Sequence, residues 1–229
     1  MQNIKRNDLW VVIAAFEEGT VIAETVSTLM RFVSNIVVVD DCSRDRTSTI
    51  ALSAGAHVLS HPINLGQGAA LQTGITYALQ QGAEHIVTFD ADGQHDAREI
   101  GPMLDALIES KADLVLGSRF LGKTKNISKS RRLLLSAALF YTRITARIKI
   151  TDVHNGFRIL TRKFCESFEF QQNRMAHASE ILDYIAAHRT PFIEFPVTIS
   201  YTEYSMRKGQ KSINAIRILM ELLMGRISK

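Results

Sequence analysis

Short apolar runs alternate with segments of helical periodicity through the first half of the chain. Residues 9–15, 36–39 and 58–59 have the character of buried strands, and apolar residues recur at helical spacing over residues 21–32. Strands that alternate with helices need crossover connections, which join parallel strands by a right-handed path. We therefore expect an α/β fold with a mostly parallel central sheet flanked by helices.

Two of the predicted strands end in pairs of carboxylates. The second strand ends in Asp40-Asp41, and the fourth, residues 86–89, ends in Asp90-Ala91-Asp92. Side chains alternate along an extended backbone, so Asp90 and Asp92 can point the same way at the strand end where open α/β sheets bind ligands. Two hard oxygen donors there suit Mg²⁺ or Mn²⁺, shared with the phosphates of a ligand. The alternative is a solvated turn, which Gly93 makes easy.

A glycine-rich stretch begins the third predicted helix. Residues 64–70 read Asn-Leu-Gly-Gln-Gly-Ala-Ala, and the helix should reach Gln81. Such a start can receive an anion at its backbone N–H groups, or it can allow the helix to pack closely. The pattern is neither GxGxxG nor a Walker loop, so both interpretations stay open.

The second half of the chain has basic segments with little periodicity. We predict a helix over 97–109, a strand over 113–117, a mobile loop suited to act as a lid over 120–129, a helix over 131–148, a turn over 152–158, a helix over 179–188, an edge strand with a proline over 192–200, a second basic loop over 204–211 and an amphipathic helix over 213–227.

Composition limits the function classes. The 229 residues fit one domain, and 46% hydrophobic with 22% charged residues is ordinary for a globular protein. The net charge of +4 permits an anionic partner, but no motif of the nucleic-acid readers occurs, so we expect no nucleic acid. Cys42 and Cys165 form no metal or disulfide pattern, which indicates the reducing cytoplasm. No apolar run approaches the roughly 20 residues of a membrane-spanning helix.

Four features in one order resemble the inverting family 2 glycosyltransferases of the GT-A fold. They are the acidic end of the first strand, Asp40-Asp41, Asp90-Ala91-Asp92 and Gly117-Ser118-Arg119. The strings Asp-Ala-Asp-Gly-Gln-His and Asn155-Gly156-Phe157-Arg158 are similar in particular to polyprenyl-phosphate sugar transferases of the dolichyl-phosphate mannose synthase type. The resemblance implies one Rossmann-like GT-A domain with three parts: a nucleotide-sugar half (9–118), an acceptor-side half (119–212) and a C-terminal amphipathic helix (213–229).

The resemblance also implies a donor pocket. Asp40 would contact the nucleotide base or ribose, together with three residues where the first strand ends: Ala14, Phe16 and Glu18. The metal, Mg²⁺ or Mn²⁺, would be held against the diphosphate by Asp90, Asp92 and Gln94. The family usually reads Pro-Thr-Tyr-Asn-Glu where residues 14–18 read Ala-Ala-Phe-Glu-Glu, so a tyrosine hydroxyl is missing and base recognition there is in doubt.

On the acceptor side the resemblance implies arginines. Arg119 and Arg132 would bind phosphate charge and count, with Asp92, as the catalytic residues, while Arg207 and Lys211 would close over the diphosphate. A lipid phosphate is already anionic and needs no strong base. A sugar hydroxyl would need one, for which the candidates are Asp152, His154 and Glu180. Arg119 in a surface ion pair and Arg132 in a solvated helix start are the plain alternatives.

The expected function is metal-dependent transfer of a hexose from a nucleotide sugar of the GDP-mannose or UDP-glucose type to a polyprenyl phosphate, with inversion. The alternatives are transfer to a hydroxyl of a lipid-linked glycan or polysaccharide precursor, and a degenerate subunit that binds without turnover. The C-terminal helix either packs on the sheet or contacts a membrane or a membrane subunit. The second possibility would place the protein peripherally at the inner face of the membrane.

Overall fold

A computed structural model describes residues 7–125, 139, 148–153, 155–173, 177–202 and 204. Its strands are β1 (Leu9–Ala15), β2 (Asn35–Asp40), β3 (His57–Ser60), β4 (His85–Thr88), β5 (Leu114–Lys125), β6 (Arg158–Thr161) and β7 (Phe192–Ser200). Its helices are α1 (Ile22–Leu29), α2 (Thr47–Ser53), α3 (Gln67–Gln80), the 3₁₀ turn η1 (Ala97–Glu99), α4 (Ile100–Ser110), α6 (Arg162–Ser167) and α7 (His177–His188).

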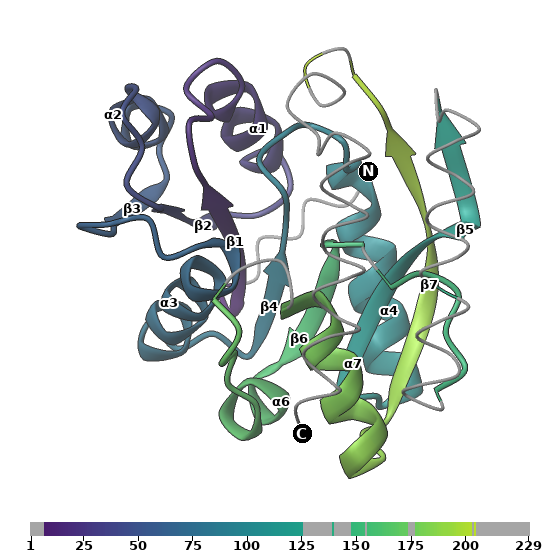
Figure 1. The fold of residues 1–229 in the computed structure, drawn as a ribbon. Helices are drawn as coiled ribbons and strands as arrows, with labels where there is room; N and C mark the ends of the chain where they lie inside the picture. Colours follow the sequence, from purple (N-terminus) through teal and green to yellow (C-terminus); the bar gives the residue numbers. More distant parts are fainter. Residues whose placement is uncertain are drawn as a thin grey trace.

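The strands form one sheet in the order β3-β2-β1-β4-β6-β5-β7 (Figure 1). The first four strands are mutually parallel, as the alternation of strands and helices predicts. β6 lies antiparallel between β4 and β5, which the sequence did not indicate. β7 pairs with β5 at the edge of the sheet, so the edge position predicted from Pro196 is confirmed.

Apolar side chains cover both faces of this sheet. Helices α1, α2 and α4 pack on one face, against residues such as Val11 and Ile13 of β1. Helices α3, α6 and α7 pack on the other face, against the alternate residues Trp10 and Val12. A strand buried on both faces is apolar at every position, which is why β1 reads as a continuous run.

The predicted loop over 120–129 is wrong in its first half, because β5 continues to Lys125. The pairing of β5 with β7 shifts register between Ser118 and Lys123. At this irregularity Gly122 lies so close to β7 that a β-carbon would stand 2.2 Å from the carbonyl oxygen of Val197. A register shift breaks the alternation of side chains by which a strand is recognised in sequence.

Several predictions fall on parts of the chain that the structure does not describe. These are residues 126–129 of the first loop, the helix over 131–148 apart from Leu139 and Ile148, the basic loop after Tyr204 and the helix over 213–227. Within the described ranges, no helix combines the length and the apolar character needed to cross a membrane.

Helix α3 packs so tightly on the sheet that Gly74 has no room for a side chain. A β-carbon there would lie 2.4 Å from Val12 Cγ1 and 3.2 Å from Val39 Cγ2, both in the core. We expect Gly74→Ala to lower the free energy of unfolding by about 1–3 kcal/mol, although alanine favours a helix by about 1 kcal/mol over glycine. Urea denaturation would measure this. Thr76→Ala, exposed on the same helix, is the control and should change stability by less than about 0.5 kcal/mol. A stabilised Gly74→Ala protein would contradict the packing.

Candidate active site

Asp90 stands just beyond the carboxyl end of β4 and is held from two sides. Its Oδ2 lies 2.9 Å from His95 Nε2, and its Oδ1 accepts a hydrogen bond of 3.2 Å from Gln67 Nε2. The His95 side chain is only 3% exposed, whereas the Asp90 side chain is 33% exposed. The carboxylate is therefore fixed by buried contacts and still accessible to a ligand.

Gly156 lies against the Asp90 carboxylate. Thr88 pairs with Arg158 in the antiparallel ladder, and continuing this register places Gly156 opposite Asp90. A β-carbon on Gly156 would stand 2.7 Å from both carboxylate oxygens. The Thr88 hydroxyl also donates to the Gly156 carbonyl at 2.6 Å. Any larger residue at position 156 would have to displace Asp90.

Asp92 lies in a region of accumulated negative charge. Burial raises its pKa to about 6, and the charges of Asp90 and Glu18 add to this effect. Gln94 donates to Asp92 through its backbone N–H (3.1 Å) and through its side-chain amide (2.6 Å). These contacts make the turn after β4 a place where a cation would relieve repulsion.

The pKa of Asp90 is shifted in the opposite direction. Burial raises its pKa, but the hydrogen bond and charge of His95 outweigh this, with further help from the charges of His177 and Arg158. The pKa of Asp90 therefore lies below its ordinary value, and the group is ionised at neutral pH. Asp90 and Asp92 thus differ because Asp90 has the hydrogen bond to His95 and the charges of His177 and Arg158, whereas Asp92 has the charge of His95 against those of Asp90 and Glu18.

The residues around this turn fit a hard divalent cation. Asp90, Asp92 and Gln94 are oxygen-bearing side chains on one short segment. Mg²⁺ and Mn²⁺ take such donors and complete their coordination with water and substrate phosphates. Among the described residues, no group of three or more His, Cys, Asp or Glu side chains forms a metal cluster.

The predicted donor-pocket residues come together where β1 and β2 end. Asp40 is buried, and its carboxylate accepts hydrogen bonds from Ser43 N (3.0 Å) and from the hydroxyls of Ser43 and Ser48. The same turn holds the end of β1, because Ser43 Oγ and Thr47 Oγ1 accept from the backbone N–H groups of Glu17 and Glu18 at 2.8 and 2.9 Å. Asp40 therefore orders the corner that the end of β1 and the turn after β2 form together.

A tyrosine from the far end of the chain completes that corner. Tyr204 donates its hydroxyl to Glu18 Oε2 at 2.7 Å and lies 3.4 Å from the carbonyl oxygen of Glu17. Burial, together with the Glu18 carboxylate, raises the pKa of Tyr204 to about 12. Phe16 is 40% exposed beside these residues, and Ala14 is half-buried within β1. Tyr204 thus brings a phenolic hydroxyl to the segment where Phe16 lacks one.

The glycine-rich start of α3 is occupied by the protein itself. Asp41 accepts from the backbone N–H groups of Leu65 (2.9 Å) and Gly66 (2.7 Å), and the N–H groups of Gly68 and Ala69 donate to the Asn173 carbonyl. A β-carbon on Gly68 would stand 2.0 Å from the Gln172 carbonyl oxygen. These contacts favour close packing over anion binding as the reason for the glycines.

Arg119 belongs to a buried network and not to the surface ion pair considered from the sequence. Its Nε donates to Asp152 Oδ2 at 2.6 Å, and its Nη1 donates to the Tyr201 hydroxyl at 2.8 Å. Burial lowers the pKa of Arg119, but Asp152 and Tyr201 more than offset this, so the pKa lies above its ordinary value. The guanidinium is therefore permanently charged and fixed in direction.

Two of the three candidate general bases already accept hydrogen bonds from other groups of the protein. Asp152 holds both the guanidinium and the backbone N–H of Arg119, and Glu180 accepts from Gln171 N and Gln172 N at 3.0 Å each. The remaining predicted site residues lie outside the described residues: Arg132, His154, Arg207 and Lys211.

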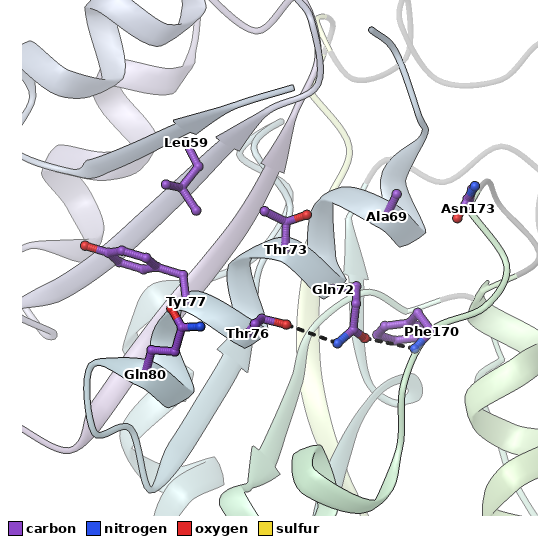
Figure 2. A pocket seen from close by; sticks show the side chains of 9 residues that line it. All are labelled: Leu59, Ala69, Gln72, Thr73, Thr76, Tyr77, Gln80, Phe170 and Asn173. Atoms are coloured by element: carbon purple, nitrogen blue, oxygen red, sulfur yellow. Dashed lines mark hydrogen bonds between the residues drawn. The ribbon is translucent and has the colours of Figure 1, made fainter. Parts of the chain in front are cut away.

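A shallow groove of about 520 Å³ runs along α3 (Figure 2). Uncharged residues line it, with Tyr77 and Thr73 from α3, Leu59 from β3, and Phe170 and Asn173 from the loop after α6. Neither Asp90 nor Asp92 contributes to it. The groove therefore lacks the charged groups that a diphosphate requires.

Sequence reasoning missed the residues that support the carboxylates. Gln67, Gly156 and Arg158 act on Asp90 from other elements, and Tyr204 reaches Glu18. The string Asn155-Gly156-Phe157-Arg158 marks this segment in the sequence, but the sequence alone gives its glycine and its arginine no role.

The sequence and the fold are both similar to those of known glycosyltransferases. Residues 10–168 match the model of glycosyl transferase family 2. The chain is 28% identical to a UDP-N-acetylglucosamine–dolichyl-phosphate N-acetylglucosaminyltransferase of Methanococcus voltae, over 96% of the chain and 97% of the relative. It is 30% identical to a polyprenol monophosphomannose synthase of Mycolicibacterium smegmatis, over 81% of the chain and 73% of the relative.

A solved structure has the same fold at low sequence identity. Glucosyl-3-phosphoglycerate synthase from Mycobacterium tuberculosis, in a complex with Mg²⁺ and uridine diphosphate, superposes with a TM-score of 0.68. The identity is 17%, and the match covers 93% of this chain and 78% of that one. With the family match over residues 10–168, these findings establish that the chain is a glycosyltransferase with a GT-A-like fold and belongs to glycosyl transferase family 2.

Proposed function

We propose that the protein transfers a hexose from a nucleoside-diphosphate sugar to a polyprenyl phosphate, with inversion and with the help of a divalent cation. The observation that carries the proposal is the pair Asp90 and Asp92 at the carboxyl end of β4, in a chain of this family. The two similar enzymes are named for dolichyl phosphate and polyprenol acceptors, which supports the acceptor class. Their names carry different sugars, so the donor stays open between the GDP and UDP types.

On the donor side, Asp90, Asp92 and Gln94 would hold Mg²⁺ or Mn²⁺. The ion, when bound, would stabilise the negative charge that develops on the departing nucleoside diphosphate. The fixed orientation of Asp90 between His95 and Gln67 keeps a carboxylate in place before the substrate arrives. Asp40, Ala14, Phe16 and Glu18 would bound the pocket for the base and ribose, and Arg207 and Lys211 would close over the diphosphate.

On the acceptor side, the proposal uses arginine and no general base. A phosphate oxygen is anionic at neutral pH and can attack without losing a proton, whereas a hydroxyl needs a carboxylate or histidine to accept one. Asp152 and Glu180 are occupied by Arg119 and by backbone N–H groups, which favours the phosphate acceptor. Arg119, fixed by Asp152 and Tyr201, would orient that phosphate together with Arg132.

The proposal also includes a location in the cell. A polyprenyl phosphate lies in a membrane, so the protein would work as a peripheral protein at the cytoplasmic face. The basic, amphipathic segment 213–229 would contact the membrane or a membrane subunit.

A thermal-shift panel of GDP, UDP and their sugar conjugates, with and without Mn²⁺, tests the donor side. A ligand that binds only the folded state raises the melting temperature by mass action, and a concentration of 100 times Kd should raise it by roughly 5–10 °C. We expect one nucleotide class to give this rise with Mn²⁺ and to lose most of it in EDTA. Transfer of label from the matching donor to a polyprenyl phosphate then tests the acceptor. No shift with any nucleotide would refute the proposed function.

Asp92→Asn should remove the metal-dependent part of donor binding. The amide keeps the shape of the side chain but lacks the charge that attracts the cation, so nucleotide affinity in Mn²⁺ should fall at least about tenfold. Calorimetry in Mn²⁺ and in EDTA separates this loss from metal-independent binding. Asp105→Asn, on the exposed side of α4, is the matched control and should bind as the wild type does. An Asp92→Asn protein with unchanged Mn²⁺ dependence would exclude Asp92 as a ligand.

Gly156→Ala should impair the enzyme through Asp90. The added methyl group would stand 2.7 Å from both carboxylate oxygens, so Asp90 must leave its contacts with His95 and Gln67. We expect turnover to fall by about 10–100-fold, with circular dichroism showing a folded protein. Gly82→Ala, in the turn between α3 and β4, is the control, since no atom lies within 4 Å of a β-carbon there. Its positive φ of 87° costs alanine some stability, so the comparison is made on turnover by folded protein. Equal turnover of both variants would show that Asp90 need not stay in place.

A further inference from the structure

Arg158 is a buried cation in the middle of the sheet. It is the first residue of β6, it pairs with Thr88 of β4 on one side and with Leu116 of β5 on the other, and it is 3% exposed. Across the contacts of the described ranges, its guanidinium makes no hydrogen bond or ion pair. A buried charge without a direct partner is costly, so it needs nearby opposite charge or a function.

The carboxylates of Asp90 and Asp152 supply the opposite charge, one on each side of Arg158. β6 lies between β4 and β5, so its first residue stands between the end of β4, where Asp90 follows, and β5, where Arg119 holds Asp152. Burial lowers the pKa of Arg158 to about 10, although the charges of Asp90 and Asp152 oppose the shift. Arg158 is therefore charged at neutral pH and attracts both groups.

The two carboxylates serve different halves of the site. Asp90 belongs to the turn that would hold the metal, and Asp152 fixes the arginine that would receive the acceptor phosphate. Both are on segments without regular structure, where little besides side-chain contacts sets their direction. A fixed positive charge between them restrains both at once, because each carboxylate gains energy by staying near it.

We propose that Arg158 is a positioning residue whose buried charge holds Asp90 and Asp152, and so couples the metal side of the site to the acceptor side. This inference rests on the proposed function. It makes the arginine of the Asn155-Gly156-Phe157-Arg158 string an electrostatic link and not a group that touches substrate. The charge matters more than the shape of the guanidinium, since no hydrogen-bond geometry is in use among the described residues.

The test compares Arg158→Gln and Arg158→Lys with Arg162→Gln. The lysine keeps the charge and the glutamine removes it, while Arg162, four residues farther along, pairs with Glu84 and Glu166 on the surface. Calorimetry measures the affinity for Mn²⁺ with the nucleotide that the wild type binds. We expect Arg158→Gln to weaken it by about 10–100-fold and Arg158→Lys by less than about threefold. Arg162→Gln should bind as the wild type does.

A second measurement needs no metal. The ¹⁵N NMR signal of the Arg119 Nε–H group reports its hydrogen bond to Asp152. It should move in Arg158→Gln and stay near the wild-type position in Arg158→Lys, because Asp152 loses its restraint only with the charge. If Arg158→Gln does not fold, the lysine variant decides: a folded Arg158→Lys that loses about tenfold or more in affinity contradicts a role for charge.

Failure of the proposed function and failure of the inference about Arg158 give different results. Wild-type protein that binds no nucleotide with Mn²⁺ refutes the proposed function, whatever the variants do. Wild-type protein that binds, with a folded Arg158→Gln that binds equally well and leaves the Arg119 signal unchanged, overturns the inference alone. In that case Arg158 only fills space in the sheet.

Discussion

The antiparallel pairing of β6 with β4 is the contact on which the candidate site depends. A parallel strand in this place would bring its carboxyl end to Asp90, but an antiparallel strand brings the residues that precede it. Gly156 and Arg158 therefore stand beside the turn after β4, and the other edge of β6 pairs with β5. β4 and β5 are thus joined through the backbone hydrogen bonds of β6.

Four aspartates lie at or just after the ends of β2 and β4, and they have two different environments. Asp40 and Asp41 are buried and satisfied by hydroxyl and backbone N–H donors, so they order the turns after β2. Asp90 and Asp92 receive fewer such donors, and burial, with repulsion from Asp90 as a smaller contribution, raises the pKa of Asp92 to about 6. In sequence the two pairs look alike, because the difference lies in which groups fold against them.

Local patterns predicted what depends on local sequence. The strands β1 to β4, the helices between them and the carboxylates after β4 follow from apolar periodicity and from strand ends. The direction of β6 and the continuation of β5 past Arg119 do not, because partners distant in sequence decide them. The contact of Tyr204 with Glu18 also joins residues distant in sequence, so local patterns do not predict it. The division into halves at residue 118 and the residue roles remain predictions.

The contact between Tyr204 and Glu18 joins positions 186 residues apart. During synthesis the chain emerges from its N-terminus, so β1 to β4 and their crossover helices can pair while the rest is still on the ribosome. The corner at the end of β1 stays open until almost the whole described chain has been made, because its last hydroxyl arrives with Tyr204. A nascent chain would therefore hold the β1 to β4 part of its sheet well before the hydrogen bond between Tyr204 and Glu18 can form.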